Sequence, residues 1–154
     1  SKNFAMTGWR VGFVFAPEAL IVALTKLQGQ STSGASTISQ YAALSALQHA
    51  REVNTFVHSE MKKRRDFFVE GLRELLPAAQ ILTPQSGLYS FVPLTAFGNE
   101  TSSVDFCEKL LTNARIASVP GIAFGNDGYV RFAFGESENE LSASLEALKG
   151  VIHS

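Results

Sequence analysis

The chain begins with SKNFAMTGWRVGF (residues 1–13), a segment that sets two isolated cations among small and apolar residues. Lys2 and Arg10 lie eight positions apart, and the apolar alternation of Val11, Phe13 and Phe15 follows at once. Chain termini are usually polar and frayed unless something holds them in place. We therefore expect this segment to come from the middle of a larger protein, at the edge of a binding site.

The composition is that of an ordinary globular chain, with 154 residues, 45% of them hydrophobic, and a net charge of -1. A nucleic-acid-binding domain would be strongly basic, and no apolar run approaches the roughly 20 residues that span a bilayer, so we expect neither partner. The scattered positions of His49, His58 and His153 argue against a metal site. Cys107, the single cysteine, is expected to be a buried thiol in a cytoplasmic protein.

The first fifty residues predict one strand and two helices. Val11–Phe15 is rich in Val and Phe and has glycines nearby, which favours a short strand. Leucines recur at helical spacing over residues 17–29, after a proline that suits the first helical position. Thr37 stands three residues before Gln40, a capping-box pattern that predicts a second helix over residues 38–49.

Residues 53–76 predict one long helix, because apolar residues recur at intervals of three and four while most charges fall on the other face. A helix of this length can bridge two domains. The remaining residues alternate strands and helices, with strands expected at 87–92, 115–119 and 129–134. We therefore divide the chain into an N-terminal part (1–52), a bridging helix (53–76) and a compact α+β domain (77–154).

Three patterns in the C-terminal part predict which side chains are buried and where a helix starts. In the strand 129–134, Arg131 is expected on the face opposite Val130, Phe132 and Phe134. Ser137-Glu138-Asn139-Glu140 forms a capping box that opens the last helix. The helix that follows the turn Gly98-Asn99-Glu100 is expected to carry an apolar stripe of Val104, Cys107, Leu110, Leu111 and Ala114.

Lys2, Arg10 and Arg131 are the candidate functional residues. Each also has a plain structural interpretation: Lys2 as a terminal surface cation, Arg10 as a cap at a strand edge, and Arg131 as a strand residue that faces solvent or pairs with an acid. Arg131 is the most informative, because a guanidinium among aromatic and apolar neighbours needs a partner. Its planar, two-pronged donor suits a carboxylate.

Several segments, in the right order, resemble the class I and II aminotransferases of the aspartate aminotransferase fold type. Residues 1–12 resemble the lysine motif that binds pyridoxal phosphate in this family. The resemblance continues through Gln28-Gly29-Gln30-Ser31-Thr32-Ser33, Arg64-Arg65-Asp66, Val119-Pro120-Gly121-Ile122-Ala123-Phe124-Gly125 and Tyr129-Val130-Arg131. It therefore covers almost the whole chain.

The resemblance implies a role for each matched residue. Lys2 would form the Schiff base with pyridoxal phosphate and then act as the base that moves a proton at the substrate Cα. Arg10 would bind the cofactor phosphate, with help from Ser1. Arg131 would bind the substrate α-carboxylate, and Phe124 would pack near the substrate. No metal is implied.

The resemblance also implies an α/β fold: the C-terminal part of a fold type I transferase, with the tail of the large domain, the bridging helix and the small α+β domain. The whole protein, expected to be a homodimer, would exchange an amino group between an aspartate-like or related amino acid and a 2-oxo acid. We expect the chain alone to be inactive, because further cofactor contacts come from residues upstream in the family. Two alternatives remain open, a C–S lyase on the same scaffold and a domain that only packs against partners.

Overall fold

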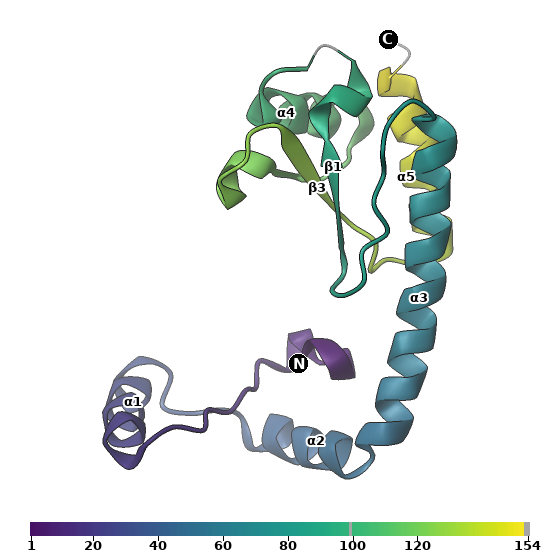
Figure 1. The fold of residues 1–154 in the computed structure, drawn as a ribbon. Helices are drawn as coiled ribbons and strands as arrows, with labels where there is room; N and C mark the ends of the chain where they lie inside the picture. Colours follow the sequence, from purple (N-terminus) through teal and green to yellow (C-terminus); the bar gives the residue numbers. More distant parts are fainter. Residues whose placement is uncertain (99, 153–154) are drawn as a thin grey trace. The chain divides into compact units, whose positions relative to one another are not determined.

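The computed structural model describes residues 1–98 and 100–152 (Figure 1). Asn99, which belongs to the expected turn after Gly98, and His153 lie outside the described residues. The chain divides into two compact units, Ser1–Ser59 and Glu60–Ser154, and the longest helix, α3 (Ala50–Leu75), contains the boundary between them. Within the described ranges, no helix has both the length and the apolar composition that a bilayer crossing requires.

The first unit is built from short and medium helices joined by irregular chain. Two of these confirm the helices expected at 17–29 and 38–49, and α3 confirms the long helix expected at 53–76 and starts three residues earlier. Two short 3-10 helices come before these helices in the chain. The first ends at Ala5 and the second at Arg10, and both residues have left-handed backbone conformation. The elements of this unit before α3 are η1 (Lys2–Phe4), η2 (Thr7–Trp9), α1 (Glu18–Ser31) and α2 (Thr37–Gln48).

Two predictions for the first unit are wrong. Residues 11–15 form no strand, because a strand needs a neighbour for its N–H and C=O groups and none of the described residues pairs with this segment. The capping box at Thr37 is also absent. Ser36 is the N-cap, without a side-chain cap, and Gln40 Nε2 instead donates to the carbonyl of Ala35 at 2.9 Å. The helix starts without the reciprocal bonds that the pattern predicts.

The first unit buries little of its apolar surface. Among its described residues, the only buried hydrophobic side chains are Met6 and Val57. Many large apolar side chains of α1, α2 and the segment before them are exposed, with Phe15 at 91% and Ile38 at 74%. An apolar surface of this extent is typical of a face that packs against further protein.

The second unit contains a three-stranded antiparallel sheet in the order β1-β3-β2. Its strands are β1 (Tyr89–Pro93), β2 (Val119–Pro120) and β3 (Tyr129–Ala133), and its further helices are η3 (Leu94–Phe97), α4 (Ser103–Ala114), η4 (Gly121–Phe124) and α5 (Glu138–Ile152). The strands expected at 87–92 and 129–134 are confirmed. The strand expected at 115–119 is wrong for residues 115–118, since β2 begins at Val119 and Arg115 is the left-handed C-cap of α4.

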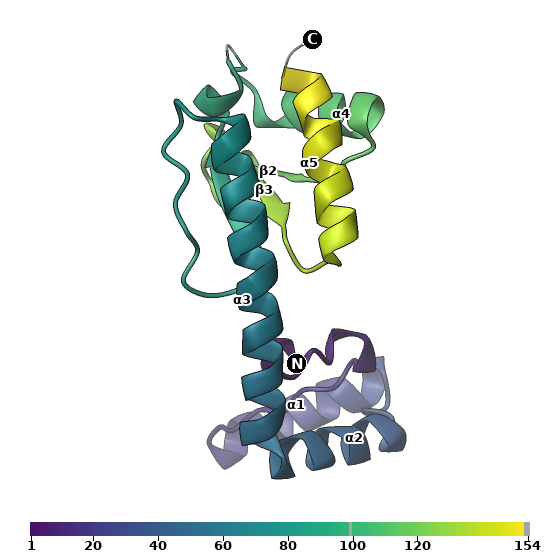
Figure 2. The same ribbon diagram turned by 90° about the vertical axis from the view of Figure 1, so that its right-hand side faces the viewer.

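The core of the second unit lies between one face of the sheet and the helices. α3 and α5 lie side by side (Figure 2). The Leu145 side chain of α5 packs closely against Gly71 of α3. Alternate residues of β1 and β3 point into this core. The buried cluster comprises Phe68, Val69, Leu72, Leu76, Ile81, Val92, Leu94, Phe97, Phe106, Cys107, Leu110, Val130, Phe132, Phe134, Leu141, Leu148 and Val151.

The predicted buried stripe of α4 is partly wrong. Cys107 and Leu110 are buried as expected, but Val104 and Leu111 are 49% and 57% exposed. The helix instead buries Phe106, whose ring centroid lies 4.6 Å from that of Phe97, because the larger aromatic side chain fills the space beside the sheet. The stripe is therefore rotated toward positions 103, 106, 107 and 110.

The second capping box is confirmed. The backbone N–H and the hydroxyl of Ser137 donate to Glu140 Oε2 at 3.0 and 2.6 Å, and the Glu140 N–H donates back to Ser137 Oγ at 3.4 Å. These bonds satisfy donors at the start of α5 that have no partner within the helix.

Candidate functional site

Arg131 stands in the middle of the central strand of the second unit. Its strand, β3, alternates so that Val130 and Phe132 are buried while Arg131 lies half-buried on the opposite face, as the sequence predicts. In the sheet register, Arg131 is opposite Phe91 of β1 and Val119 of β2. Its backbone is thus held from both sides, and its side chain rises from a fixed point of the sheet.

Two aromatic rings from different elements face the Arg131 guanidinium. Its carbon Cζ lies 4.0 Å from the ring centroid of Tyr89, on β1, and 4.6 Å from that of Phe124, the last residue of η4. Both distances are within the range of a cation–π interaction. The structure therefore brings Phe124 together with Arg131, as the resemblance implied for two residues of one site.

Two more rings extend this surface. Phe91 stacks on Tyr129 with the ring centroids 4.7 Å apart and the planes 9° from parallel. The Phe91 ring also meets Phe124 nearly at right angles, at 6.1 Å. We call Tyr89, Phe91, Phe124 and Tyr129 the aromatic platform.

The hydrogen-bonding groups of Arg131 are available for a ligand. Among residues 1–98 and 100–152, no carbonyl or carboxylate accepts a hydrogen bond from its guanidinium. A half-buried guanidinium without an anionic partner keeps its fork of N–H donors for a carboxylate or phosphate. Arg131 is therefore a candidate anion-binding group.

The position of Phe124 depends on how η4 is anchored. The Ile122 N–H donates to Ser103 Oγ at 3.3 Å, and the Asn126 N–H donates to the Gly121 carbonyl at 3.0 Å. Ser103 in turn donates to Asp127 Oδ1 from its hydroxyl and, at 2.9 Å, from its backbone N–H. The hydrogen bond from the Ser103 hydroxyl is the main cause that lowers the pKa of the Asp127 carboxyl, and the bond from the Ser103 N–H adds to it. Desolvation opposes both with a smaller effect.

The other three predicted site residues, Ser1, Lys2 and Arg10, belong to the first unit and are exposed. Arg10 Nη1 donates to the Thr7 carbonyl at 3.1 Å, which leaves its other N–H groups free. In the described part of the chain, no carboxylate pairs with Lys2 or Arg10. A free amine, a guanidinium and a hydroxyl on one short segment fit the aldehyde and phosphate ends of pyridoxal phosphate.

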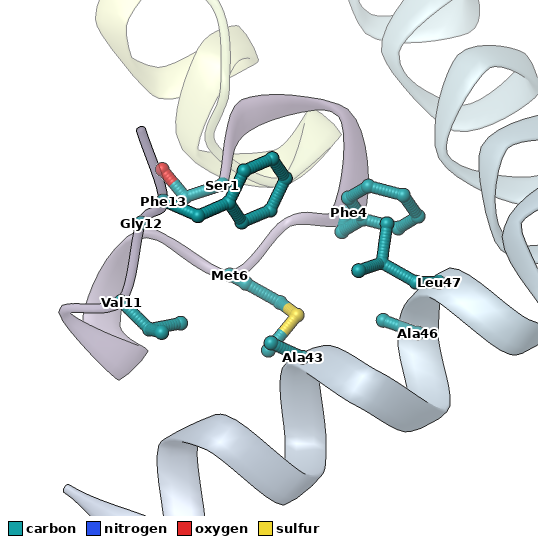
Figure 3. A pocket seen from close by; sticks show the side chains of 9 residues that line it. All are labelled: Ser1, Phe4, Met6, Val11, Gly12, Phe13, Ala43, Ala46 and Leu47. Atoms are coloured by element: carbon teal, nitrogen blue, oxygen red, sulfur yellow. The ribbon is translucent and has the colours of Figure 1, made fainter. Parts of the chain in front are cut away.

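A hollow in the first unit does not coincide with these cations. Its volume is about 270 Å³, and its walls come from the N-terminal segment and α2 (Figure 3). Met6 points toward Ala43 of α2, and Phe4 lies beside Leu47. Ser1 lines it, but neither Lys2 nor Arg10 does, and most of its wall is apolar packing between the segment and the helix.

Sequence reasoning missed Tyr89 as part of the site. The signal that could have found it is the alternation of β1, which places Tyr89 and Phe91 on the face opposite the buried Ser90 and Val92.

Among the described residues there is no candidate metal site, because no three His, Cys, Asp or Glu side chains form a group that could hold an ion.

The sequence matches the model for aminotransferase class I and II over residues 1–148. The chain belongs to this family. It is 39% identical to the bifunctional aspartate aminotransferase and glutamate/aspartate-prephenate aminotransferase of Petunia hybrida, over 99% of this chain and 34% of that protein. It is 35% identical to the aspartate aminotransferase of Thermotoga maritima, over 100% of this chain and 38% of that protein.

Solved structures of the family share the fold. An aromatic aminotransferase of Pyrococcus horikoshii superposes with a TM-score of 0.82 at 33% identity, over 98% of this chain and 40% of that one. The predicted class, α/β of fold type I, is confirmed for this chain. The chain spans little more than a third of the length of the curated relatives it matches.

Proposed function

We propose that the whole protein containing this chain is a pyridoxal-phosphate-dependent aminotransferase that exchanges an amino group between an amino acid and a 2-oxo acid. The observation that carries the proposal is the unpaired Arg131 guanidinium against two aromatic rings on a central strand, in a chain of this family. Such a group suits the α-carboxylate that amino acids and 2-oxo acids share. Membership of the family supports the choice of cofactor.

Some residues of the chain would bind the cofactor and others would bind the substrate. Pyridoxal phosphate, when bound, supplies an aldehyde that condenses with amines and a ring that withdraws electrons from the substrate Cα. Lys2 Nζ would hold the cofactor and, once free, accept and return the proton at Cα. Arg10 would bind the phosphate with Ser1. Arg131 would fix the α-carboxylate, which orients the Cα–H bond, and Phe124 would exclude water beside it.

The proposal includes the organisation of the protein. We assign residues 1–52 to the end of a large cofactor-binding domain, residues 53–76 to a bridging helix and residues 77–154 to the small domain. The largely exposed apolar side chains of the first unit support its packing against further protein. We expect a homodimer in the cytoplasm, with little activity in the chain by itself.

The test uses the whole protein with pyridoxal phosphate and measures amino transfer from aspartate to 2-oxoglutarate. Borohydride reduction should attach the cofactor to the peptide that contains Lys2, as read by mass spectrometry. Lys2→Ala should abolish both signals, whereas Lys26→Ala, which removes an exposed lysine of α1, should change neither.

Full activity of Lys2→Ala would refute the assignment. Formation of ammonia and pyruvate from cystathionine, without amino transfer, would identify a C–S lyase instead. Absence of both reactions, with no cofactor attached, would leave only a packing role.

A further inference from the structure

We propose that Tyr89 is a positioning residue that, with Phe124, fixes the orientation of the Arg131 guanidinium for carboxylate binding. The inference rests on the proposed role of Arg131 and adds to it a residue with no assigned function. Its basis is that the guanidinium faces two rings, 4.0 and 4.6 Å from its carbon Cζ, while no described residue accepts a hydrogen bond from it.

A long arginine side chain on a sheet has several rotamers, and polar partners usually select one of them. Arg131 has no such partner within the described chain, so the rings take this role. A guanidinium lying against an aromatic face is attracted by the ring quadrupole and keeps the N–H groups at its edge free. Tyr89 and Phe124 thus restrain the cation without using its donors.

The two rings are supported unequally. Phe124 meets the edge of Phe91, which is itself stacked on Tyr129, and η4 is anchored through Ser103. Tyr89 lies on β1 with its backbone opposite Ala133, and its closer ring distance makes it the stronger contact to Arg131. Tyr89 is 38% exposed, so replacing its side chain leaves the buried core unchanged.

The interaction requires the ring and not the hydroxyl. Tyr89→Phe should therefore preserve the orientation of Arg131, because phenylalanine keeps the aromatic face. Tyr89→Leu keeps an apolar side chain on the strand and removes the ring quadrupole. The pair separates the aromatic contact from simple occupancy of the site.

The kinetic experiment compares the wild-type whole protein with Tyr89→Phe and Tyr89→Leu. In Tyr89→Leu the KM for the amino acid should rise about fivefold, the size expected for one cation–π contact, with kcat within about twofold. Tyr89→Phe should stay within about twofold of wild type in both constants. The slow reaction of an amine without an α-carboxylate should be the same in all three proteins.

A second readout does not depend on activity. The Nε–H resonance of Arg131, assigned by its loss in Arg131→Lys, should be shifted upfield by the rings in wild type and Tyr89→Phe. It should move toward the position of a free arginine in Tyr89→Leu.

The outcomes separate the two claims. If the wild-type protein shows no amino transfer, the proposed function is contradicted. The Nε–H resonance of Arg131 then still tests whether Tyr89 positions the guanidinium. An active wild type whose Tyr89→Leu variant keeps its KM and its Nε–H shift overturns the inference. A fall in kcat alone, or an equal effect in Tyr89→Phe, also overturns it.

Discussion

Asp127 accepts two hydrogen bonds from Ser103, which lies 24 positions earlier in the chain, on a single carboxylate oxygen. The same Ser103 hydroxyl accepts the N–H of Ile122 in η4. The pair therefore joins the first residue of α4 to the short helix that ends at Phe124. Through this link, the position of one ring against Arg131 depends on a carboxylate that does not touch it.

The pH dependence of stability should reveal this contact. Hydrogen bonds from Ser103 hold the pKa of Asp127 below its ordinary value of 3.8, so the carboxylate stabilises the fold above that pH, and the contribution is lost as the pH falls through the lower, folded pKa. Native-state hydrogen exchange of the β3 amides should show this loss on acidification below about pH 4. In Asp127→Asn that part of the pH dependence should be missing, and Ser103→Ala should weaken it. Parallel curves for wild type and Asp127→Asn would contradict the assignment.

Gly121→Ala should destabilise the second unit. A Cβ at this buried position would overlap the backbone carbonyl oxygens of Asn126 and Tyr129, which cannot move as a flexible side chain could. We expect a loss of about 1–3 kcal/mol in the free energy of unfolding, as for other overpacked sites. Urea unfolding followed by circular dichroism measures it. Gly150→Ala, in α5, meets no atom within 4 Å and should cause no loss.

The sequence predicts elements whose signals are local. Periodicity locates the long helix α3, alternation places Arg131 opposite the buried face of β3, and the pairing of Ser137 with Glu140 starts α5. The strand expected at 11–15 fails because pairing is not a local property. The contact of Tyr89 with Arg131 depends on the register between β1 and β3, which no short pattern encodes.

Arg73→Gln should loosen the irregular segment between α3 and β1. Arg73 Nη2 donates to the Ile81 carbonyl and to Thr83 Oγ1, both at 2.8 Å, so it ties the segment to the helix. Loss of these bonds should cost about 1–2 kcal/mol and speed proteolysis between residues 77 and 88. Arg115→Gln is the control. It removes the same charge from a side chain that makes no hydrogen bond within the described residues, so the cleavage rate should not change.

Cys107 should resist thiol reagents until the second unit opens. Burial raises the pKa of its thiol, and the hydroxyl of Ser118, which donates to Sγ at 3.1 Å, opposes only part of that effect. Because the thiolate is the reactive form, iodoacetamide at pH 8 should modify native Cys107 at least about a hundredfold more slowly than glutathione. The rate of Cys107 modification should rise with urea in parallel with the hydrogen exchange of core amides.

A Ser142→Cys variant is the control. Its new thiol, exposed on α5, should react at once while Cys107 remains protected. Rapid labelling of Cys107 without urea would show that α4 does not bury it in solution.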